Sequence, residues 1–259
     1  MGLFDKKYCD VCGEKIGLLG NRKLADGNLC KDCAGKLSPW FSDRRQSTIE
    51  EIKEQLNYRE QNKDAVANFN VTKTFGNGHC VFIDEFARNF MIGYTGRLDK
   101  DNPDVVSLDA ITGVEIEQVE HKKEVYQKDA EGKDVSYNPK RYAFSYDIKL
   151  LIHVNNPYFD EMTYQVNTFS IDTGVPPMLQ GVQTSQPMYN MNFKEQWMKA
   201  EEIKAALLAK EEVITETAEE TAPAPAPAPA AEPVTCPGCG ATVLPDEKGK
   251  CPYCRSQLI

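Results

Sequence analysis

Eight of the nine cysteines in this 259-residue chain form four C-x-x-C pairs, and this spacing constrains the fold more than any other feature. Two residues between thiolates let one turn present both sulfurs to one ion, and two such turns complete a tetrahedron. The spacing therefore predicts two structural Zn²⁺ ions, each held by four thiolates with no position left open for catalysis. The predicted ligand sets lie near the two ends of the chain: Cys9, Cys12, Cys30 and Cys33, and Cys236, Cys239, Cys251 and Cys254.

Other chemistries of the same cysteines fit the sequence less well. Disulfides need an oxidising compartment, and the first residues, MGLFDKKYC, lack the apolar core of a secretory signal. A redox C-x-x-C needs a βαβ context, which neither end offers. Iron can occupy the same four sulfurs, and the spacing does not separate it from zinc. The ninth cysteine, Cys80, stands in the apolar run 80–83 and is predicted to be a buried core thiol rather than a nucleophile.

Glycine follows two of the pairs and supports the predicted metal turns. Gly13 comes after Cys12 and Gly240 comes after Cys239, where a positive φ turns backbone N–H groups toward the sulfurs. Arg255 takes this position after the last pair, so we expect a less regular turn there.

Two stretches resemble known metal-binding families. Residues 9–41, CDVCGEKIGLLGNRKLADGNLCKDCAGKLSPWF, resemble a small bacterial zinc-ribbon family of unknown function in the C-x-x-C-G start, the Asp-Gly turn and the C-x-x-C-A-x-K-L ending. That resemblance implies zinc and no biochemical activity. Residues 236–254, CPGCGATVLPDEKGKCPYC, are similar to rubredoxin-like ribbons, a widespread pattern.

The middle of the chain has the periodicity of a β-rich domain. Apolar residues alternate without a break from Tyr142 to Val154, which predicts a long half-buried strand. Further strands are predicted at 69–75, 79–84, 88–95, 111–120 and 162–166, with a polar loop or hairpin tip at 127–140. A capping-box pattern at Ser47 and Glu50 predicts a helix over 48–62. A second helix is predicted over 193–212 with one apolar face, formed by Phe193, Trp197, Ala200, Ile203 and Leu207.

This order of elements predicts a mainly β fold with flanking helices. Antiparallel strands followed by one amphipathic helix resemble a pleckstrin-homology-like split barrel, and residues 108–116 are similar to a strand entry in bacterial domains of that class. Two packed sheets without a capping helix are the alternative. The predicted domains are an N-terminal zinc ribbon (1–45), a connector helix (46–64), the β-rich domain with its helix (65–212), an acidic Ala/Pro-rich linker (213–235) and a C-terminal zinc ribbon (236–259).

Charge limits the possible partners. The chain has a net charge of −9, and only residues 1–45 are clearly basic, with nine Lys or Arg against six Asp or Glu. Nucleic-acid binding draws on clustered cations, so the acidic balance disfavours it. Phosphoinositide binding by the middle domain is also disfavoured, because its first hairpin has only Lys73 near the turn.

The sequence favours a non-enzymatic adaptor that binds another protein and carries two structural Zn²⁺ ions. The alternative is a ribbon protein associated with nucleic acid or the ribosome. An enzyme is the third possibility, but His79, His121 and His153 are scattered on predicted strands and no catalytic motif is present. Because the sequence has neither an export signal nor a long apolar run, we expect a cytoplasmic bacterial protein without a membrane span. The sequence does not indicate the oligomeric state.

Overall fold

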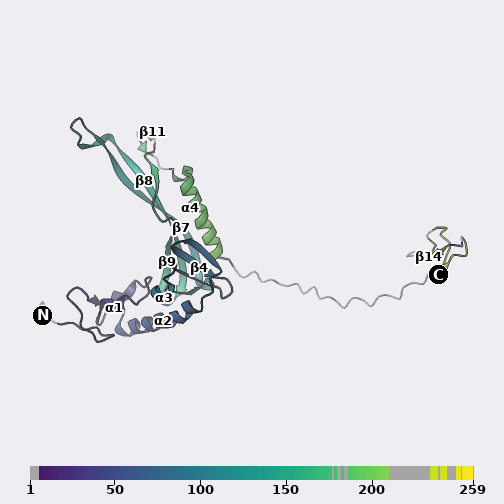
Figure 1. Cartoon of the computed structure of the whole chain (residues 1–259), viewed down its shortest axis with the longest axis horizontal. Helices are drawn as coiled ribbons and strands as arrows, with labels where there is room; N and C mark the ends of the chain where they lie inside the picture. Colours follow the sequence, from purple (N-terminus) through teal and green to yellow (C-terminus); the bar gives the residue numbers. More distant parts are fainter. Residues whose placement is uncertain are drawn as a thin grey trace. The chain divides into compact units, whose positions relative to one another are not determined.

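The structure is a computed structural model, and it forms two compact units, residues 1–210 and 211–259. It describes residues 6–176, 178–179, 182–183, 186–209, 234–238, 240–243, 249–251 and 253–258 (Figure 1). Most of the predicted linker at 213–235 lies outside the described residues. None of the described helices is long and apolar enough to cross a membrane.

The N-terminal ribbon is a small two-stranded sheet followed by short helices. Its elements are β1 (Arg22–Lys23), β2 (Asn28–Leu29), α1 (Lys31–Ala34) and the 3₁₀ helix η1 (Asp43–Arg45). The turn between β1 and β2 packs closely on Ile49, the first residue of helix α2 (Ile49–Ala67). A Cβ on Gly27 would lie 2.7 Å from both Asp10 Oδ2 and Ile49 Cδ1, so a larger residue there would displace these side chains.

Helix α2 (Ile49–Ala67) is longer than the predicted 48–62 and begins one residue later than the predicted capping box. Thr48 is the N-cap, and its hydroxyl accepts from the Glu51 N–H while the Glu51 carboxylate accepts from the Thr48 N–H at 2.7 Å. Ser47 is not available as a cap, because it is buried and its hydroxyl donates to the Asp43 carbonyl at 3.0 Å.

The buried face of α2 is largely polar and joins the ribbon to the sheets. Arg59 and Asp104 form an ion pair at 2.7 Å, with the Asp104 side chain completely buried. Ser38 Oγ, from the end of the ribbon, donates to the other Asp104 oxygen at 2.9 Å. Asn62 Nδ2 donates to the Pro103 carbonyl at 2.7 Å. We call this group the polar seam.

The first sheet is a four-stranded antiparallel meander in the order β3-β4-β5-β6. The predicted strands at 79–84 and 88–95 are confirmed, the strand predicted at 69–75 lies at 73–77 instead, and the strand at 106–107 was not predicted. Its strands are β3 (Lys73–Asn77), β4 (His79–Asp84), β5 (Asn89–Tyr94) and β6 (Val106–Ser107). The short helix α3 (Leu98–Asp101) lies between β5 and β6 and leads into the Asp104 loop.

The second sheet is built on two long strands joined by a hairpin. It follows the short 3₁₀ helix η2 (Leu108–Ala110) and has the order β10-β8-β7, with β9 also paired to β8. Its strands are β7 (Ile111–Lys128), β8 (Asp134–Asn156), β9 (Phe159–Gln165) and β10 (Ile171–Gly174). The alternation predicted for 142–154 is confirmed, because Phe144, Tyr146, Ile148, Leu150, Ile152 and Val154 are all buried.

Helix α4 (Met191–Leu207) covers the second sheet and shares its core. It follows the hairpin β11 (Met178–Leu179) and β12 (Val182–Gln183) and the 3₁₀ helix η3 (Pro187–Tyr189). Its buried residues Phe193, Ala200, Ile203 and Leu207 lie on the predicted face, and Trp197 packs partly against the core. The helix ends at Leu207, with Leu208 as its cap, rather than at the predicted residue 212.

The two sheets share one hydrophobic core, and the described strands close no barrel. The fold is therefore mostly β with a few helices.

The polar segment 127–140 is the tip of the β7–β8 hairpin, so the prediction of a hairpin tip is confirmed and the alternative of a loop throughout was wrong. Strands β7 and β8 pair as far as Lys128 and Asp134, with a register shift that leaves residues 137–140 without a partner in β7, and residues 129–133 form the turn. The tip of the β7–β8 hairpin is two-stranded, because β9 and β10 pair with β8 only from Phe144 onward (Figure 1). Both faces of a two-stranded hairpin reach solvent, which explains why the amino-acid composition of this segment resembles that of a loop.

The second unit contains a small hairpin, β13 (Val234–Thr235) and β14 (Thr242–Val243). Its described core consists of Cys236, Val243 and Cys251, with Ala241 and Leu258 packed partly against them.

Candidate metal centres

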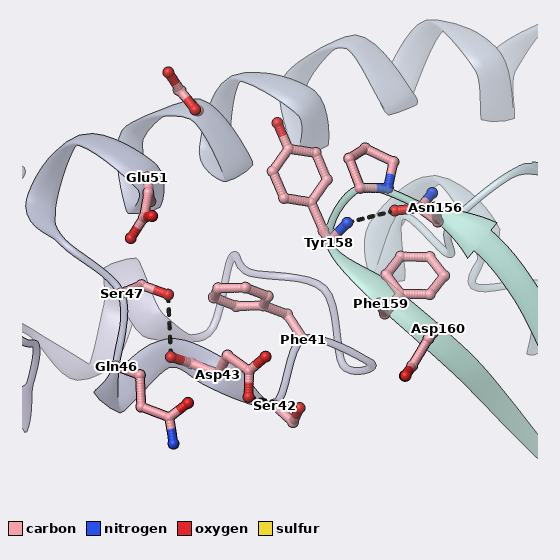
Figure 2. A pocket seen from close by; sticks show the side chains of 12 residues that line it. Phe41, Ser42, Asp43, Gln46, Ser47, Glu51, Asn156, Tyr158, Phe159 and Asp160 are labelled. Atoms are coloured by element: carbon pink, nitrogen blue, oxygen red, sulfur yellow. Dashed lines mark hydrogen bonds between the residues drawn. The ribbon is translucent and has the colours of Figure 1, made fainter.

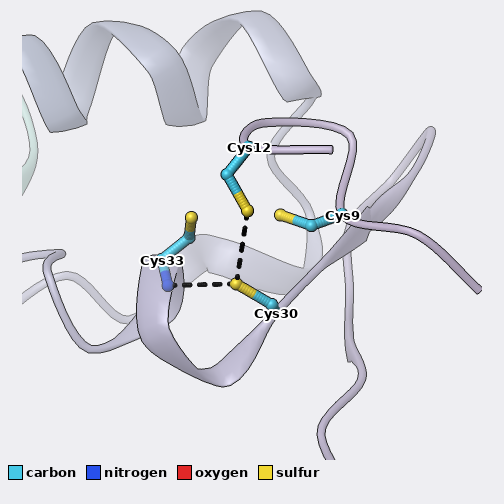
Figure 3. A group of neighbouring side chains, drawn as sticks. All are labelled: Cys9, Cys12, Cys30 and Cys33. Atoms are coloured by element: carbon cyan, nitrogen blue, oxygen red, sulfur yellow. Dashed lines mark hydrogen bonds between the residues drawn. The ribbon is translucent and has the colours of Figure 1, made fainter. Parts of the chain in front are cut away.

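The first cysteine set forms a compact cluster in the N-terminal ribbon. The sulfurs of Cys9, Cys12, Cys30 and Cys33 all lie within 4.8 Å of one another. Figure 3 shows the four side chains directed toward a common centre. Cys12 Sγ and Cys30 Sγ are 3.8 Å apart, which matches the edge of about 3.8 Å in a tetrahedron with metal–sulfur bonds of about 2.3 Å. The donor set therefore fits a four-coordinate thiolate-bound ion.

Local backbone structure holds each pair in place. After the first pair, the Gly13 N–H donates to the Cys9 carbonyl at 2.8 Å and Gly13 takes a φ of 77°. Cys30 is instead the N-cap of α1, and its sulfur accepts from the Cys33 N–H at 3.3 Å. One pair therefore sits on a tight turn and the other on the first turn of a helix.

The pKa values of Cys9 and Cys33 are shifted in opposite directions. Burial alone would raise the pKa of Cys9, but hydrogen bonds from the backbone N–H groups of Cys12, Cys30 and Val11 outweigh it and lower the pKa to about 6. Burial and the neighbouring thiols raise the pKa of Cys33 above its ordinary value. Negative charges this close repel one another, so a cation is needed to ionise all four sulfurs together.

A hollow lined by basic and acidic residues lies beside the first centre. This hollow of about 440 Å³ borders Cys12 and Cys33 and is also lined by four basic residues, Lys36, Arg59, Lys63 and Lys100, with the acids Glu60 and Asp101. Four thiolates around one dication carry a net charge of −2, which nearby cations stabilise.

The second cysteine set is also brought together. The sulfurs of Cys236, Cys251 and Cys254 lie within 4.8 Å of one another, and Cys236 Sγ is 3.4 Å from Cys254 Sγ. The fourth predicted ligand, Cys239, lies outside the described residues. The Gly238 N–H donates to Cys236 Sγ at 3.3 Å. The described sulfurs thus supply three ligands of the same chemistry as in the first centre.

The turn after the last pair is as regular as the glycine turns, so the expectation of a less regular turn at Arg255 was wrong. The Arg255 N–H donates to the Cys251 carbonyl at 2.8 Å, as the Gly240 N–H does to the Cys236 carbonyl. Arg255 adopts a φ of 59°, close to the 74° of Gly240. A non-glycine residue in this left-handed region is held there at a cost in free energy.

A second concave feature lies where the ribbon, α2 and the β8–β9 turn meet. This acidic hollow, about 820 Å³, is drawn in Figure 2. Four carboxylates belong to its lining, those of Asp43, Glu51, Glu54 and Asp160, and among the described lining residues there is no Lys or Arg. The sequence offered no signal for it, because its walls come from segments over a hundred residues apart.

The other candidate residues do not come together in one place. His121 Nε2 lies 2.8 Å from Asp147 Oδ2, and His153 Nε2 lies 3.7 Å from Glu115 Oε1. His79 packs against Tyr94 in the first sheet, and burial lowers the pKa of its imidazole. Cys80 is a buried core thiol, as predicted, at 1% exposure.

Comparison with known proteins identifies the first centre with a domain family. Residues 7–55 match the model of a family described as a domain of unknown function, DUF4428. The match includes all four cysteines of the first centre and the start of α2. No curated protein and no solved structure matches the chain. The chain therefore has a DUF4428 domain with a four-cysteine cluster at its N-terminus and a second cysteine group near its C-terminus.

Proposed function

We propose that this chain is a non-enzymatic adaptor that binds another protein and is stabilised by two structural Zn²⁺ ions. The observation that carries the proposal is the pair of cysteine clusters. Four thiolates complete the preferred shell of Zn²⁺ and leave no position for a substrate or an activated water. In this proposal Cys9, Cys12, Cys30 and Cys33 hold one ion, and Cys236, Cys239, Cys251 and Cys254 hold the other. Iron in the same sulfurs is the competing assignment.

The proposal that the chain is not an enzyme is supported by how the titratable groups are engaged. His121 pairs with the buried Asp147, which also accepts hydrogen bonds from Asn167 and Ser170. These bonds are typical of a satisfied structural network rather than of a nucleophile beside a free base.

Eight predicted metal thiolates also favour a reducing compartment, which supports a cytoplasmic location.

The acidic hollow supports a protein as the partner. Its four carboxylates complement a basic segment, and its walls come from the ribbon exit, α2 and the second sheet. A partner that inserts Lys or Arg there would contact the zinc-stabilised ribbon and the β-rich body at once. Such charge complementarity is typical of specific protein interfaces.

We further propose that the two sheets and α4 form a pleckstrin-homology-like split barrel. The support is the order of elements, antiparallel strands β3 to β10 followed by one helix that covers the second sheet.

Affinity purification of the full chain tests the adaptor proposal. We expect one protein to co-purify with the unchanged chain and to be lost with the double variant Glu54→Lys and Asp160→Lys, which reverses two carboxylates of the acidic hollow. Glu201→Lys is the matched control, because Glu201 is exposed on α4 and lies away from the hollow. Retention of the partner by the double variant would contradict the proposed interface.

The second candidate is a ribbon protein that binds nucleic acid. The basic charge of residues 1–45 favours it. A gel-shift series over salt tests it, because electrostatic binding is strongest at low salt. Absence of any retardation at the lowest salt would remove this candidate.

A further inference from the structure

The N-terminal ribbon presents two leucines that are almost fully exposed. Leu18 and Leu19 each have a relative exposure of 89%. They are the central residues of a turn in which the Gly20 N–H donates to the Gly17 carbonyl at 3.0 Å. Ile16, directly before the turn, is buried in the ribbon core and anchors it. We call this feature the leucine tip.

Four basic residues follow the leucine tip, two on β1 and two on η1. Arg22 and Lys23 form β1, and Arg22 Nη1 donates to the Leu19 carbonyl at 3.2 Å. Arg44 Nη1 donates to the Lys23 carbonyl at 2.9 Å, which brings η1 with Arg44 and Arg45 against β1. Burial and the positive charges of Arg22 and Arg45 lower the pKa of Arg44, as expected for cations in proximity. These four residues are the basic rim.

The cations of the basic rim form no ion pair with the carboxylates that the structure describes. Within the described part of the chain, none of its four cations is within the 4.0 Å of a carboxylate oxygen that defines an ion pair. Two nearby carboxylates accept backbone hydrogen bonds instead, Asp10 from the Asn28 N–H at 2.6 Å and Asp26 from the Ile49 N–H at 2.8 Å. A chain with a net charge of −9 thus keeps a local group of unpaired positive charges beside an exposed apolar turn.

We infer that this face of the ribbon docks reversibly on an anionic phospholipid surface. The leucine tip enters the boundary between headgroups and acyl chains, and the basic rim contacts the phosphates. Nucleic acid would satisfy the cations, but its phosphate backbone offers the two leucines no apolar environment. The basic rim and the acidic hollow share no residue, although both use the 3₁₀ helix η1, from which Asp43 lines the hollow and Arg44 and Arg45 belong to the rim.

Vesicle flotation with the full zinc-loaded chain tests the inference. We expect the chain to float with phosphatidylcholine vesicles that contain phosphatidylserine, to stay in solution with phosphatidylcholine alone, and to detach as salt rises. The double variant Leu18→Ser and Leu19→Ser should bind at least about tenfold more weakly, because it removes the apolar contribution. Lys23→Glu with Arg45→Glu should cost at least about twentyfold, since each cation contributes about fivefold.

Two control variants separate this contact from general surface effects. Phe86→Ser removes a side chain of 86% exposure on the β4–β5 turn, and Lys53→Glu reverses an exposed charge on α2. Both should bind like the unchanged chain, and the zinc content of every variant shows whether the ribbon is folded.

Several results would overturn the inference. The inference would be wrong if the unchanged chain did not float with the vesicles, if it bound neutral vesicles equally well, or if the leucine variant bound as strongly as the unchanged chain. Retardation of DNA or RNA that depends on the basic rim but not on the leucines would also overturn it and assign the rim to nucleic acid. None of these results bears on the protein partner of the acidic hollow, which is measured separately.

Discussion

The two cysteine centres share their ligand chemistry and differ in what surrounds them. The first has a core of its own, in which Leu24, Leu29 and Ile52 are buried beside the cysteines. It is also tied to the β-rich body through the polar seam and through Trp40, which packs against the main core. In the second, Val243 is the only buried apolar residue among the described residues besides cysteines.

The same kind of cysteine cluster therefore lies in two different structural settings. A unit as small as the second one buries too little apolar surface to fold without its ion. The first site is one of several contributions to a larger folded body. The effect of losing an ion should therefore stay local at the C-terminus and spread at the N-terminus.

The largest effect is expected from Cys251→Ser. Loss of one ligand removes most of a binding free energy of about 10–16 kcal/mol, so the second unit should unfold completely. Amide hydrogen exchange should show no protection left in residues 234–258 and unchanged protection in the first unit. Cys80→Ser is the control, because it removes a buried thiol outside both clusters and should leave the metal content unchanged. Persistent protection of the second unit would mean that its fold does not depend on metal.

A smaller but wider effect is expected from Cys9→Ser. The cysteine spacing alone predicts that Cys9→Ser unfolds only the N-terminal ribbon, so that the β-rich domain keeps its melting transition. The polar seam and Trp40 predict instead that the transition of the β-rich body falls by about 5–10 °C, for about 2–3 kcal/mol of lost contacts. Scanning calorimetry of the full chain measures this shift. An unchanged β-sheet transition would restore the view of the ribbon as an independent module.

Breaking the polar seam directly should destabilise the first unit without removing its metal. Arg59→Met leaves the Asp104 carboxylate buried without its cation, at a cost of about 3–5 kcal/mol. The matched control is Arg97→Met, which removes a pair with Asp101 in which the Arg97 side chain is 57% exposed and should cost about 0–1 kcal/mol. Urea unfolding of both variants gives the difference. Equal stability of the two would show that the seam does not couple the ribbon to the sheets.

The smallest effect is expected from Arg255→Gly and has the opposite sign. Glycine adopts a left-handed φ of 59° without the steric cost that Arg255 carries there, so the substitution should stabilise the second unit by up to about 1 kcal/mol. Competition with a chelator should show slower metal loss from this centre and no change at the first. Faster loss would mean that the Arg255 side chain contributes more than its backbone conformation costs.

The sequence predicted the features that follow from a local pattern. Cysteine spacing predicted the two groups of cysteines, of which the seven described ones come together as expected, and strict alternation identified the strand through residues 142–154. Helical spacing identified the buried face of α4.

Features that depend on distant contacts were missed. The buried face of α2 contains the polar residues Arg59 and Asn62, which a search for an apolar helix face does not find, because their partners Asp104 and Pro103 lie some forty residues away in the sequence. The hairpin ends at 126–128 and 134–136 have a solvated composition, and backbone pairing rather than burial makes them strands. The cap moved from Ser47 to Thr48 because tertiary packing buried the serine.

The most direct test of this account is the metal stoichiometry of the freshly purified full chain, measured by elemental analysis together with X-ray absorption at the zinc edge. The account predicts two Zn²⁺ per chain, each surrounded by four sulfurs at about 2.3 Å. Clearly fewer than two equivalents, oxygen or nitrogen in the first shell, or cysteines joined as disulfides would contradict it.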